Sequence, residues 1–409
     1  MPPTWREKML DAKKIRKDFP VFDTGIIYLD SAATSQKPRQ VIEAVSNFYK
    51  TKNSNVARGL YRIAEEATMA YESVRKKAAS FINAREAGEI IFTRNTTEGA
   101  NLVMRGWGEK NMGKGGKVAT TMLEHHTNFV PWQVLAKRKG AEFAVAEITD
   151  EGLLDEADLE QKIRGASLVA VSAASNVLGT MPDTKKICRI AHDNGALCFV
   201  DAAQYAPSIP VNVKEMGCDF LAFSGHKMLA PFGAGVLYGR HDILEDMDPL
   251  LYGSEMIREV HPDHSEWAEI PHKFEAGTPA VDAVVGLGAA MDYLSSAGLE
   301  NIRNHEMELV KLMLERLSEI KGLEILGPED PGRRGALVAF TVEGVHPHDI
   351  SAMLSEDNVC VRSGHHCAMP LHTRLGVAAS TRASVYLYNT KEDIDALAES
   401  LHKVEKLFK

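Results

Sequence analysis

Cysteine is scarce in this sequence, with five residues among 409 and no CxxC pair. An odd number of cysteines spread along a long chain argues against a disulfide framework, which is typical of small secreted domains. Cys188, Cys198 and Cys218 lie in or beside apolar runs, so we expect them to be small core residues, and we expect the same of Cys360. The fifth, Cys367, lies among histidines instead. This usage predicts a reducing compartment, and we expect the protein to be cytoplasmic.

Excess positive charge and long apolar runs are also lacking. Lys and Arg total 47 against 56 Asp and Glu, so the formal net charge of −9 does not favour a nucleic-acid partner. The first twenty residues contain no apolar segment of signal-peptide length, and no later run is long enough to span a membrane. We therefore expect neither nucleic acid nor a membrane as a partner. The 44% hydrophobic and 25% charged residues are typical of a globular protein large enough for two domains.

The chain does contain short β-rich apolar runs that alternate with amphipathic helical stretches. This alternation predicts an α/β fold with a mainly parallel sheet. After a long helical pattern the order changes to strand, helix and strand, so we place a domain boundary near residue 290. We expect an N-terminal arm (1–25) that joins the small domain, a large domain (26–290) and a smaller α+β domain (291–409). The seven apolar runs are 89–94, 117–122, 141–148, 166–175, 196–203, 219–225 and 233–239.

Polar residues follow several of these runs, at the sheet edge where α/β proteins bind ligands. Asp201 and Gln204 follow the apolar run ALCFV. A carboxylate at a buried strand end needs a compensating partner, which the protonated ring nitrogen of a cofactor would supply. The alternative is that Asp201 caps the next helix. Thr96 and Thr97 begin a helix after another strand, where they either hold a phosphate or form an ordinary helix cap.

Lys227 ends a further buried run, in the segment SGHK. Apolar surroundings disfavour the charged form of a lysine amine, which makes it available as a nucleophile near neutral pH, as Schiff-base chemistry requires. Taken alone, Lys227 is equally compatible with an ordinary lysine in a turn. With Asp201 upstream to balance a pyridinium, the pair indicates a pyridoxal phosphate site.

Cys367 lies in the segment VCVRSGHHCAMPLH, and metal ligation, a disulfide and nucleophilic chemistry are all to be considered. Adjacent histidines do not face one metal from a regular strand or helix, and the spacing differs from that of common zinc sites. A disulfide with Cys360 would need a folded-back loop in a reducing compartment. The other histidine-rich stretch, residues 261–272, is polar and irregular, and we expect a solvated loop there. We predict no metal site.

Nine segments together resemble cysteine desulfurases of the SufS type, within the fold-type I, class V aminotransferase group. They occur in the same order almost from end to end of the chain. The resemblance implies a mainly parallel seven-stranded sheet in the large domain, a small domain that carries the cysteine loop, a pyridoxal 5′-phosphate cofactor and a homodimer. The segments are DSAATSQKP, TTEGAN, EHHTNFVPWQ, SNVLGT, VDAAQ, FSGHKMLAPFGAGVLYG, FEAGTP, RSGHHCAMPLH and RASVYLYNT.

The resemblance also implies roles for individual residues. Lys227 would form the Schiff base, and Cys367 would take sulfur from L-cysteine as a persulfide, leaving L-alanine. His125 would stack on the cofactor ring and assist proton transfer. Asp201 would pair with the pyridinium nitrogen of the cofactor, and Gln204 would hydrogen-bond its phenolic oxygen. The cofactor phosphate would be bound by Thr96, Thr97, Ser224 and His226, and Thr278 would contact the phosphate in the partner subunit. Asn176 and Arg382, supported by Arg362, would bind the substrate carboxylate.

The implied partners are a sulfur acceptor of the SufE or SufU type or the scaffold of a Suf system, for iron–sulfur cluster assembly. Selenocysteine would serve as a second substrate. Three residues depart from the family pattern: Ala57 and Tyr61 replace histidines and Ser254 replaces a glycine, and these changes concern access, partner contact and pH dependence. The competing hypotheses are an aminotransferase or epimerase of the same fold, which needs no thiol, and an inactive scaffold that only binds a sulfur-transfer partner.

Overall fold

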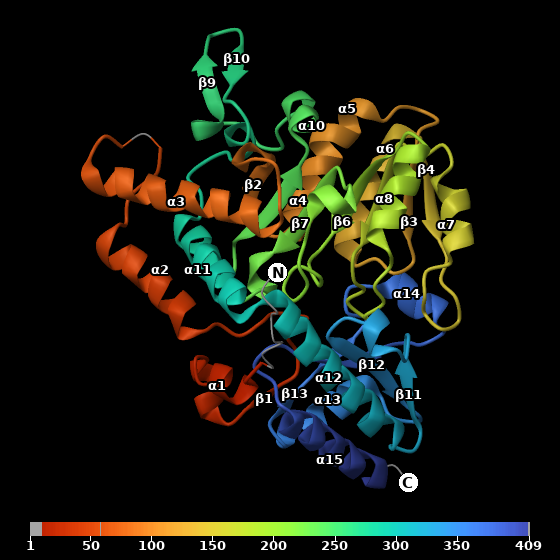
Figure 1. The fold of residues 1–409 in the computed structure, drawn as a ribbon. Coiled ribbons are helices and arrows are strands. Elements are labelled where there is room, and N and C mark those ends of the chain that lie inside the picture. The colour runs from red at the N-terminus through yellow and green to blue at the C-terminus, as the bar shows by residue number, and fades with distance from the viewer. Residues whose placement is uncertain (1–9, 58, 408–409) are drawn as a thin grey trace, which may run out of the picture.

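The computed structural model describes residues 10–57 and 59–407, which contain a seven-stranded and a four-stranded sheet (Figure 1). The first nine residues of the predicted arm lie outside the described residues. In the large sheet β8 is antiparallel to both of its neighbours and the other pairs are parallel, which confirms the mainly parallel seven-stranded prediction. The strands are, in spatial order, β2 (Ile90–Thr93), β8 (Gly235–Gly239), β7 (Phe220–Ser224), β6 (Leu197–Asp201), β5 (Leu168–Ser172), β3 (Lys117–Thr121) and β4 (Glu142–Ala146).

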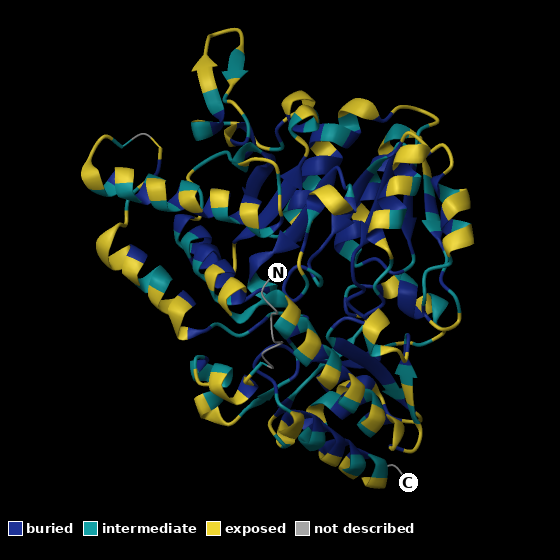
Figure 2. Ribbon diagram, in the orientation of Figure 1, coloured by how far each residue is buried: buried dark blue, intermediate teal, exposed yellow. Residues whose placement is uncertain are grey.

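The large sheet is buried on both faces, as Figure 2 shows. Successive strand residues point to opposite faces, so Ile91 joins one hydrophobic cluster while Ile90 and Phe92 join another. Burial on both sides explains why these strands are continuous apolar runs in the sequence. On the Ile91 side lie α4 (Thr96–Val103), α6 (Val130–Lys139) and α10 (His241–Asp246). On the other side lie α2 (Arg39–Thr51), α3 (Arg62–Phe81), α7 (Glu156–Ile163), α8 (Thr184–Asp193), α9 (Val213–Met216) and α11 (Val281–Ala297).

The C-terminal part is built on an antiparallel four-stranded sheet with its own hydrophobic cluster. Its strands are, in spatial order, β11 (Leu323–Leu326), β12 (Leu337–Val342), β15 (Ser380–Ser384) and β14 (Arg362–Gly364). The helices of this part are α12 (Leu299–Ser318), α13 (Pro347–Glu356), α14 (Met369–Arg374) and α15 (Lys391–Leu407).

The N-terminal segment lies against the C-terminal part. Strand β1 (Ile27–Tyr28) pairs in parallel with β13 (Val359–Cys360). Helix α1 (Ala12–Arg16) is held to α15 by the Arg16 guanidinium, which donates to the Asp393 carboxylate at 2.8 Å. Residue 290 falls inside α11, and the domain boundaries stay a prediction.

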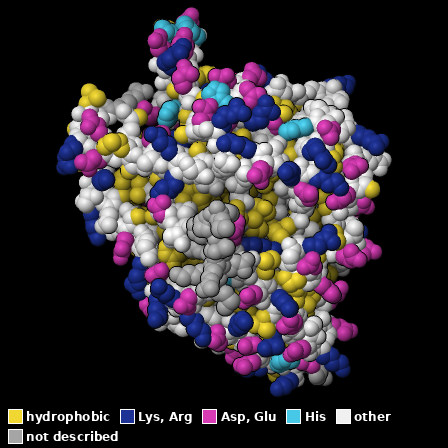
Figure 3. Space-filling model, in the orientation of Figure 1, with side chains coloured by type: hydrophobic (Ala, Val, Ile, Leu, Met, Phe, Trp, Pro, Cys, Tyr) yellow, Lys and Arg dark blue, Asp and Glu magenta, His cyan; other side chains and the backbone are white. Residues whose placement is uncertain are grey.

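A short hairpin projects from the large-sheet part, where an irregular loop had been expected (Figure 1). Strands β9 (Ile257–Val260) and β10 (Ser265–Trp267) pair antiparallel, so the expectation of irregular structure is wrong. Its residues are mostly exposed, and histidine side chains gather at its tip (Figures 2 and 3). A hairpin with no buried face carries no alternation of apolar and polar residues, so no strand could be predicted there from the sequence pattern.

Within residues 10–57 and 59–407, no helix combines the length and apolar character needed to cross a membrane. In the same ranges no group of three or more His, Cys, Asp or Glu side chains is placed to bind a metal. On the face seen in Figure 3, acidic and basic side chains are interspersed over the surface.

Candidate active site

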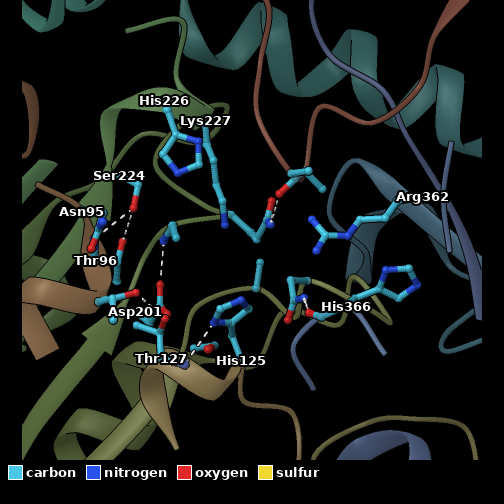
Figure 4. Close-up of a pocket in the computed structure, with 18 of the residues that line it drawn as sticks. Asn95, Thr96, His125, Thr127, Asp201, Ser224, His226, Lys227, Arg362 and His366 are labelled. Atoms are coloured by element: carbon cyan, nitrogen blue, oxygen red, sulfur yellow. Dashed lines mark hydrogen bonds between the residues drawn. The ribbon is translucent and has the colours of Figure 1, made fainter. Parts of the chain in front are cut away.

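A polar cavity of about 190 Å³ lies where strands of the large sheet end against the small sheet (Figure 4). The last residues of β5, β6 and β7, which are Ser172, Asp201 and Ser224, line it from one side. Arg362 on β14 and Arg382 on β15 line it from the other. The structure brings together eleven of the thirteen predicted site residues here: Thr96, Thr97, His125, Asn176, Asp201, Gln204, Ser224, His226, Lys227, Arg362 and Arg382.

One end of the cavity is a cradle of hydroxyl groups at the start of α4. Asn95 caps this helix by accepting from the Glu98 backbone N–H at 3.0 Å, so the two threonines lie in the first turn rather than at the cap. The Thr96 backbone N–H donates to Ser224 Oγ at 2.9 Å, and the Thr97 hydroxyl lies 2.7 Å from that of Thr127. Hydroxyls and the N-terminus of a helix together favour a phosphate group.

Asp201 is buried at the floor of the cavity and accepts from the Ala203 backbone N–H at 2.9 Å. The next helix begins only at Val213, so Asp201 does not cap a helix. Burial raises the pKa of Asp201, while the Ala203 bond and the positive charge of Lys227 oppose that rise. A buried carboxylate in this setting is suited to a cationic ring nitrogen. Gln204 donates from Nε2 to the Ala32 carbonyl at 2.8 Å.

Lys227 follows β7 and extends into the cavity (Figure 4). Burial lowers the pKa of its amine to about 8, the negative charge of Asp201 opposes this, and Arg382 lowers the pKa further. A large fraction of the Lys227 amine is therefore neutral near pH 8, and only the neutral form has a lone pair for nucleophilic or basic chemistry.

His125 is held as a neutral imidazole. Its Nδ1 accepts from the Thr127 backbone N–H at 3.0 Å, so in the neutral ring the hydrogen is on Nε2. Burial lowers the pKa of His125 to about 3, and the charge of Lys227 acts in the same direction. The ring thus lines the cavity with an apolar face and a single N–H donor.

Beside His125 is a buried carboxyl that sequence reasoning missed. Glu124 accepts from the Thr121 hydroxyl, the Ser172 backbone N–H and the Asn128 side chain. Burial raises the pKa of Glu124 to about 7, although these hydrogen bonds act against the rise. The Glu124 network fixes the turn that carries His125. Glu124 is the first residue of the segment EHHTNFVPWQ, which carries part of the family resemblance. Nothing in the sequence, however, distinguishes Glu124 from a surface carboxylate.

The opposite end of the cavity carries two arginines that face each other across β14 and β15. Arg382 is fully buried and donates to the Asn176 carbonyl at 2.8 Å and to Asp30 at 3.1 Å. Arg362 is its direct cross-strand neighbour. Two like charges in register repel, and Asp30 supplies only one compensating carboxylate. This end therefore favours an anion such as a carboxylate. Asp30 was also missed, although it begins the segment DSAATSQKP.

Cys367 lies in a loop beside the cavity and is half-buried. Among the described residues, the cavity lining includes neither Cys367 nor Thr278. The position of Cys367 beside the cavity follows from its neighbour His366, which lines the cavity and whose backbone carbonyl accepts from Asn176 Nδ2 at 2.6 Å. The loop is fixed by His126, whose backbone N–H donates to the Cys367 carbonyl at 2.7 Å. Both Cys367 and His366 have positive φ, at 58° and 49°.

All five cysteines are free thiols. Cys188, Cys198 and Cys218 are buried in one hydrophobic cluster, which confirms that they are core residues. Cys360 is only half-buried, so the expectation of a core position was wrong for it. It lies in β13 at the edge of a two-stranded pair, where one side of the strand remains open.

Thr278 is exposed in this chain, and its predicted contact is with a partner subunit, so that role stays a prediction. Of the three departures from the family pattern, Tyr61 is exposed, and its hydroxyl lies 2.8 Å from that of Ser54. Ala57 and Ser254 have φ of 73° and 62°. Positive φ favours glycine, so Ser254 occupies backbone geometry suited to the glycine it replaces.

Comparison with known proteins gives consistent relatives. The family aminotransferase class-V matches residues 27–397. A probable cysteine desulfurase of Halalkalibacterium halodurans is 48% identical over 405 residues, covering 98% of this chain and 99% of that protein. A cysteine desulfurase from Thermococcus onnurineus NA1, solved in its apo form, superposes with a TM-score of 0.93 at 41% identity, covering 98% of each chain. The cysteine desulfurase CsdA from Escherichia coli, solved as the S-sulfonic acid, superposes with a TM-score of 0.92 at 35% identity, covering 98% of this chain and 100% of that chain.

Proposed function

This chain belongs to the class-V aminotransferase family, and from that premise we propose that it is a cysteine desulfurase. It would convert L-cysteine to L-alanine and take the sulfur on Cys367 as a persulfide. The observation that carries the proposal is the placement of Cys367 on a loop held by the His126 backbone N–H, directly after His366, which lines the same cavity as Lys227. The free state of all five cysteines supports a reducing compartment, and we propose the cytoplasm.

The cofactor is pyridoxal 5′-phosphate, and the residues of the cavity fit it. Thr96, Thr97 and Ser224 would hold its phosphate. His226 would contribute as well, because its Nδ1 is buried and has no hydrogen-bond partner among the described residues. Asp201 would hold the ring nitrogen. When bound, the cofactor supplies an electron sink that stabilises negative charge on the substrate carbon.

The arginine pair would bind and orient the substrate. Arg382 and Asn176 take the carboxylate of L-cysteine, supported by Arg362. With its carboxylate held there, the amino acid presents its α-carbon to Lys227. The neutral Lys227 amine takes the proton from the α-carbon and later returns a proton to the product. His125 packs its neutral ring over the cavity and offers its Nε2–H for proton transfer.

Cys367 would act as the nucleophile. Its thiolate attacks the sulfur of the substrate, a sulfur–sulfur bond forms and the carbon–sulfur bond breaks, so that alanine leaves and a persulfide remains on the protein. An aminotransferase or epimerase would use Lys227 and Asp201 but would have no use for this thiol.

The test is incubation of the cofactor-loaded protein with L-cysteine and a reductant, measuring sulfide and alanine together. We expect equal amounts of both from the native protein. Cys367→Ala should lower both at least about 1000-fold, because the nucleophile is gone. Cys360→Ala is the matched control and should retain activity, since that half-buried thiol lies on β13. A keto acid or racemised substrate without sulfide would contradict desulfuration and favour the other reactions of this fold.

The lowered pKa of Lys227 predicts how cofactor attachment depends on pH. Only the neutral amine attacks a carbonyl, so the rate at which Lys227 condenses with added pyridoxal 5′-phosphate should rise about tenfold per pH unit below pH 8 and level off above it. Absorbance of the apoprotein after mixing measures this rate, with a lysine peptide as the control that continues to rise toward pH 10. A protein profile that follows the peptide would contradict a buried, depressed Lys227.

Finer features of the function rest on the resemblance. We propose a homodimer in which the exposed Thr278 reaches the phosphate site of the partner subunit. The physiological role would be delivery of sulfur to a SufE- or SufU-type acceptor, or to a Suf scaffold, for iron–sulfur cluster assembly. Selenocysteine would be a second substrate, because its carbon–selenium bond breaks more readily. The described arm residues 10–25 would join a small domain that begins near residue 291.

A further inference from the structure

His366 precedes the proposed nucleophile and is buried, with 4% of its surface exposed. It lines the cavity at the arginine end, beside Arg362 and opposite the hydroxyl cradle (Figure 4). Its positive φ of 49° turns the chain sharply between β14 and Cys367. A buried imidazole in such a backbone conformation is held in one orientation. Its two nitrogen atoms therefore face different surroundings and can be considered one at a time.

The tautomer of His366 is set by its contacts. Its Nε2 lies 3.2 Å from the Ser380 carbonyl oxygen, which can only accept, so Nε2 carries the hydrogen. The Ser380 hydroxyl lies 3.1 Å from the same nitrogen and 2.9 Å from His372 Nε2. His372 Nδ1 lies 3.0 Å from the Ala368 carbonyl and therefore donates, which leaves His372 Nε2 to accept from the serine. The chain of donors thus runs from His366 through Ser380 to His372.

The Nδ1 atom of His366 is consequently a hydrogen-bond acceptor. It is buried and has no partner among the described residues. Burial, and after it the charge of Arg382, strongly lower the pKa of His366, so the ring stays neutral and Nδ1 keeps its lone pair. An unsatisfied buried acceptor is costly, and a ligand that brings a hydrogen removes that cost.

Two polar atoms of other residues that line the cavity are also buried without a hydrogen-bond partner. Asn176 Oδ1 is a buried acceptor and Arg382 Nε is a buried donor, and neither has a partner within the described part of the chain. A carboxylate satisfies Arg382 but offers no hydrogen to His366. A ligand that carries a hydrogen donor as well as a carboxylate satisfies both residues, and in L-cysteine the groups that carry hydrogens are the amine and the thiol.

We propose that His366 Nδ1 accepts a hydrogen bond from the side-chain thiol of the substrate and so selects a thiol-bearing amino acid over an aliphatic one of equal shape. This rests on the proposed desulfuration. The amine of the substrate is committed to the Lys227 end, which leaves the thiol for His366. Because His366 adjoins Cys367 in the chain, a thiol held there is presented to the nucleophile.

The test compares L-cysteine with L-2-aminobutyrate, in which a methyl group replaces the thiol. Dissociation constants are measured by absorbance titration of the cofactor-loaded Cys367→Ala protein, in which sulfur transfer is blocked. We expect L-cysteine to bind about fivefold more tightly or better, the ratio for one neutral hydrogen bond. If the Cys367→Ala protein with His366 intact binds the two amino acids equally tightly, the proposal is overturned, whatever the His366 variants show.

Two variants separate an acceptor role from a structural one. His366→Asn keeps an oxygen near the Nδ1 position but loses the Ser380 contact, and its short side chain tolerates positive φ. His366→Gln reaches Ser380 but leaves no acceptor near Nδ1. We expect the cysteine preference to survive in His366→Asn and to vanish in His366→Gln. The reverse pattern, or an unchanged preference in both, would overturn the proposal. Absence of sulfide from the native protein would instead refute the underlying desulfuration.

Discussion

Lys227→Ala is expected to lower sulfide and alanine production at least about 1000-fold. The reason is that the amine of Lys227 is the cavity's basic group with a pKa of about 8, so its loss removes both cofactor attachment and the acceptor for the α proton. The variant should also release the cofactor on gel filtration and should fix no cofactor when treated with borohydride. Activity assays and the absorbance of the desalted protein measure both effects.

Lys37→Met is the matched control for this experiment. Burial also lowers the pKa of Lys37 to about 8, so a depressed pKa alone does not distinguish the two lysines. Lys37, however, donates to the Thr34 hydroxyl and to the backbone carbonyls of Ser35 and His226, and it lies outside the cavity lining formed by the described residues. We expect Lys37→Met to retain borohydride-fixed cofactor. Attachment that persists in Lys227→Ala and disappears in Lys37→Met would reverse the assignment.

The large sheet could be predicted from the sequence because each strand is an apolar run ended by polar or small residues. The run at 166–175 contains β5 (Leu168–Ser172), and the run at 219–225 contains β7 (Phe220–Ser224). Burial on both faces makes such strands continuous in hydrophobicity, so they stand out without any knowledge of their neighbours. The order of the strands in the sheet depends on crossovers between distant segments and is not contained in the runs themselves.

Shorter and edge elements could not be predicted in this way. The two residues of β1 pair with β13 more than 300 positions later, and the hairpin β9–β10 has little contact with any core. Neither has a periodic apolar face, because one is too short and the other is solvated. Cys360 illustrates the same limit, since an apolar neighbourhood in sequence did not ensure a buried position in a two-stranded pair.

The site residues divide by the same principle. Asp201 and Lys227 could be recognised because an ionisable group at or just beyond the end of a buried strand is unusual in itself. Asp30 could not, because its significance comes from Arg382, 352 positions away. His366 likewise acquires its orientation from Ser380 and His372, and its free Nδ1 is defined only once those contacts exist. The catalytic roles themselves stay predictions until the variants are measured.

Arg75→Met is expected to destabilise the protein by about 3–5 kcal/mol, because it leaves the Glu275 carboxylate buried without its cation. Arg75 is 1% exposed and donates two parallel bonds to Glu275, at 2.7 and 2.9 Å, and one to the Ile90 carbonyl. It also donates to Glu72, at 2.9 and 3.0 Å, but that carboxylate is partly exposed and remains solvated when Arg75 is removed. This pair ties α3 to the strand β2 and to the segment FEAGTP. Urea unfolding followed by fluorescence measures the loss as a lower midpoint.

A second substitution tests whether the loss comes from the unpaired charge rather than from the missing side-chain volume. Arg75→Met combined with Glu275→Gln removes the stranded carboxylate, while the glutamine retains an oxygen able to accept from the Phe92 backbone N–H or the Tyr71 hydroxyl. We expect the double variant to be more stable than Arg75→Met alone, which is a coupling that additive effects cannot give. As a control, Arg316→Met breaks the more exposed 2.8 Å pair with Asp395 and should lower the urea midpoint far less than Arg75→Met. Equal losses in Arg75→Met and the double variant would mean that packing, not charge, holds this junction.

Since Glu275 lies three residues before Thr278, a loosened junction should also weaken the dimer proposed above. The oligomeric state of Arg75→Met at falling protein concentration measures that consequence.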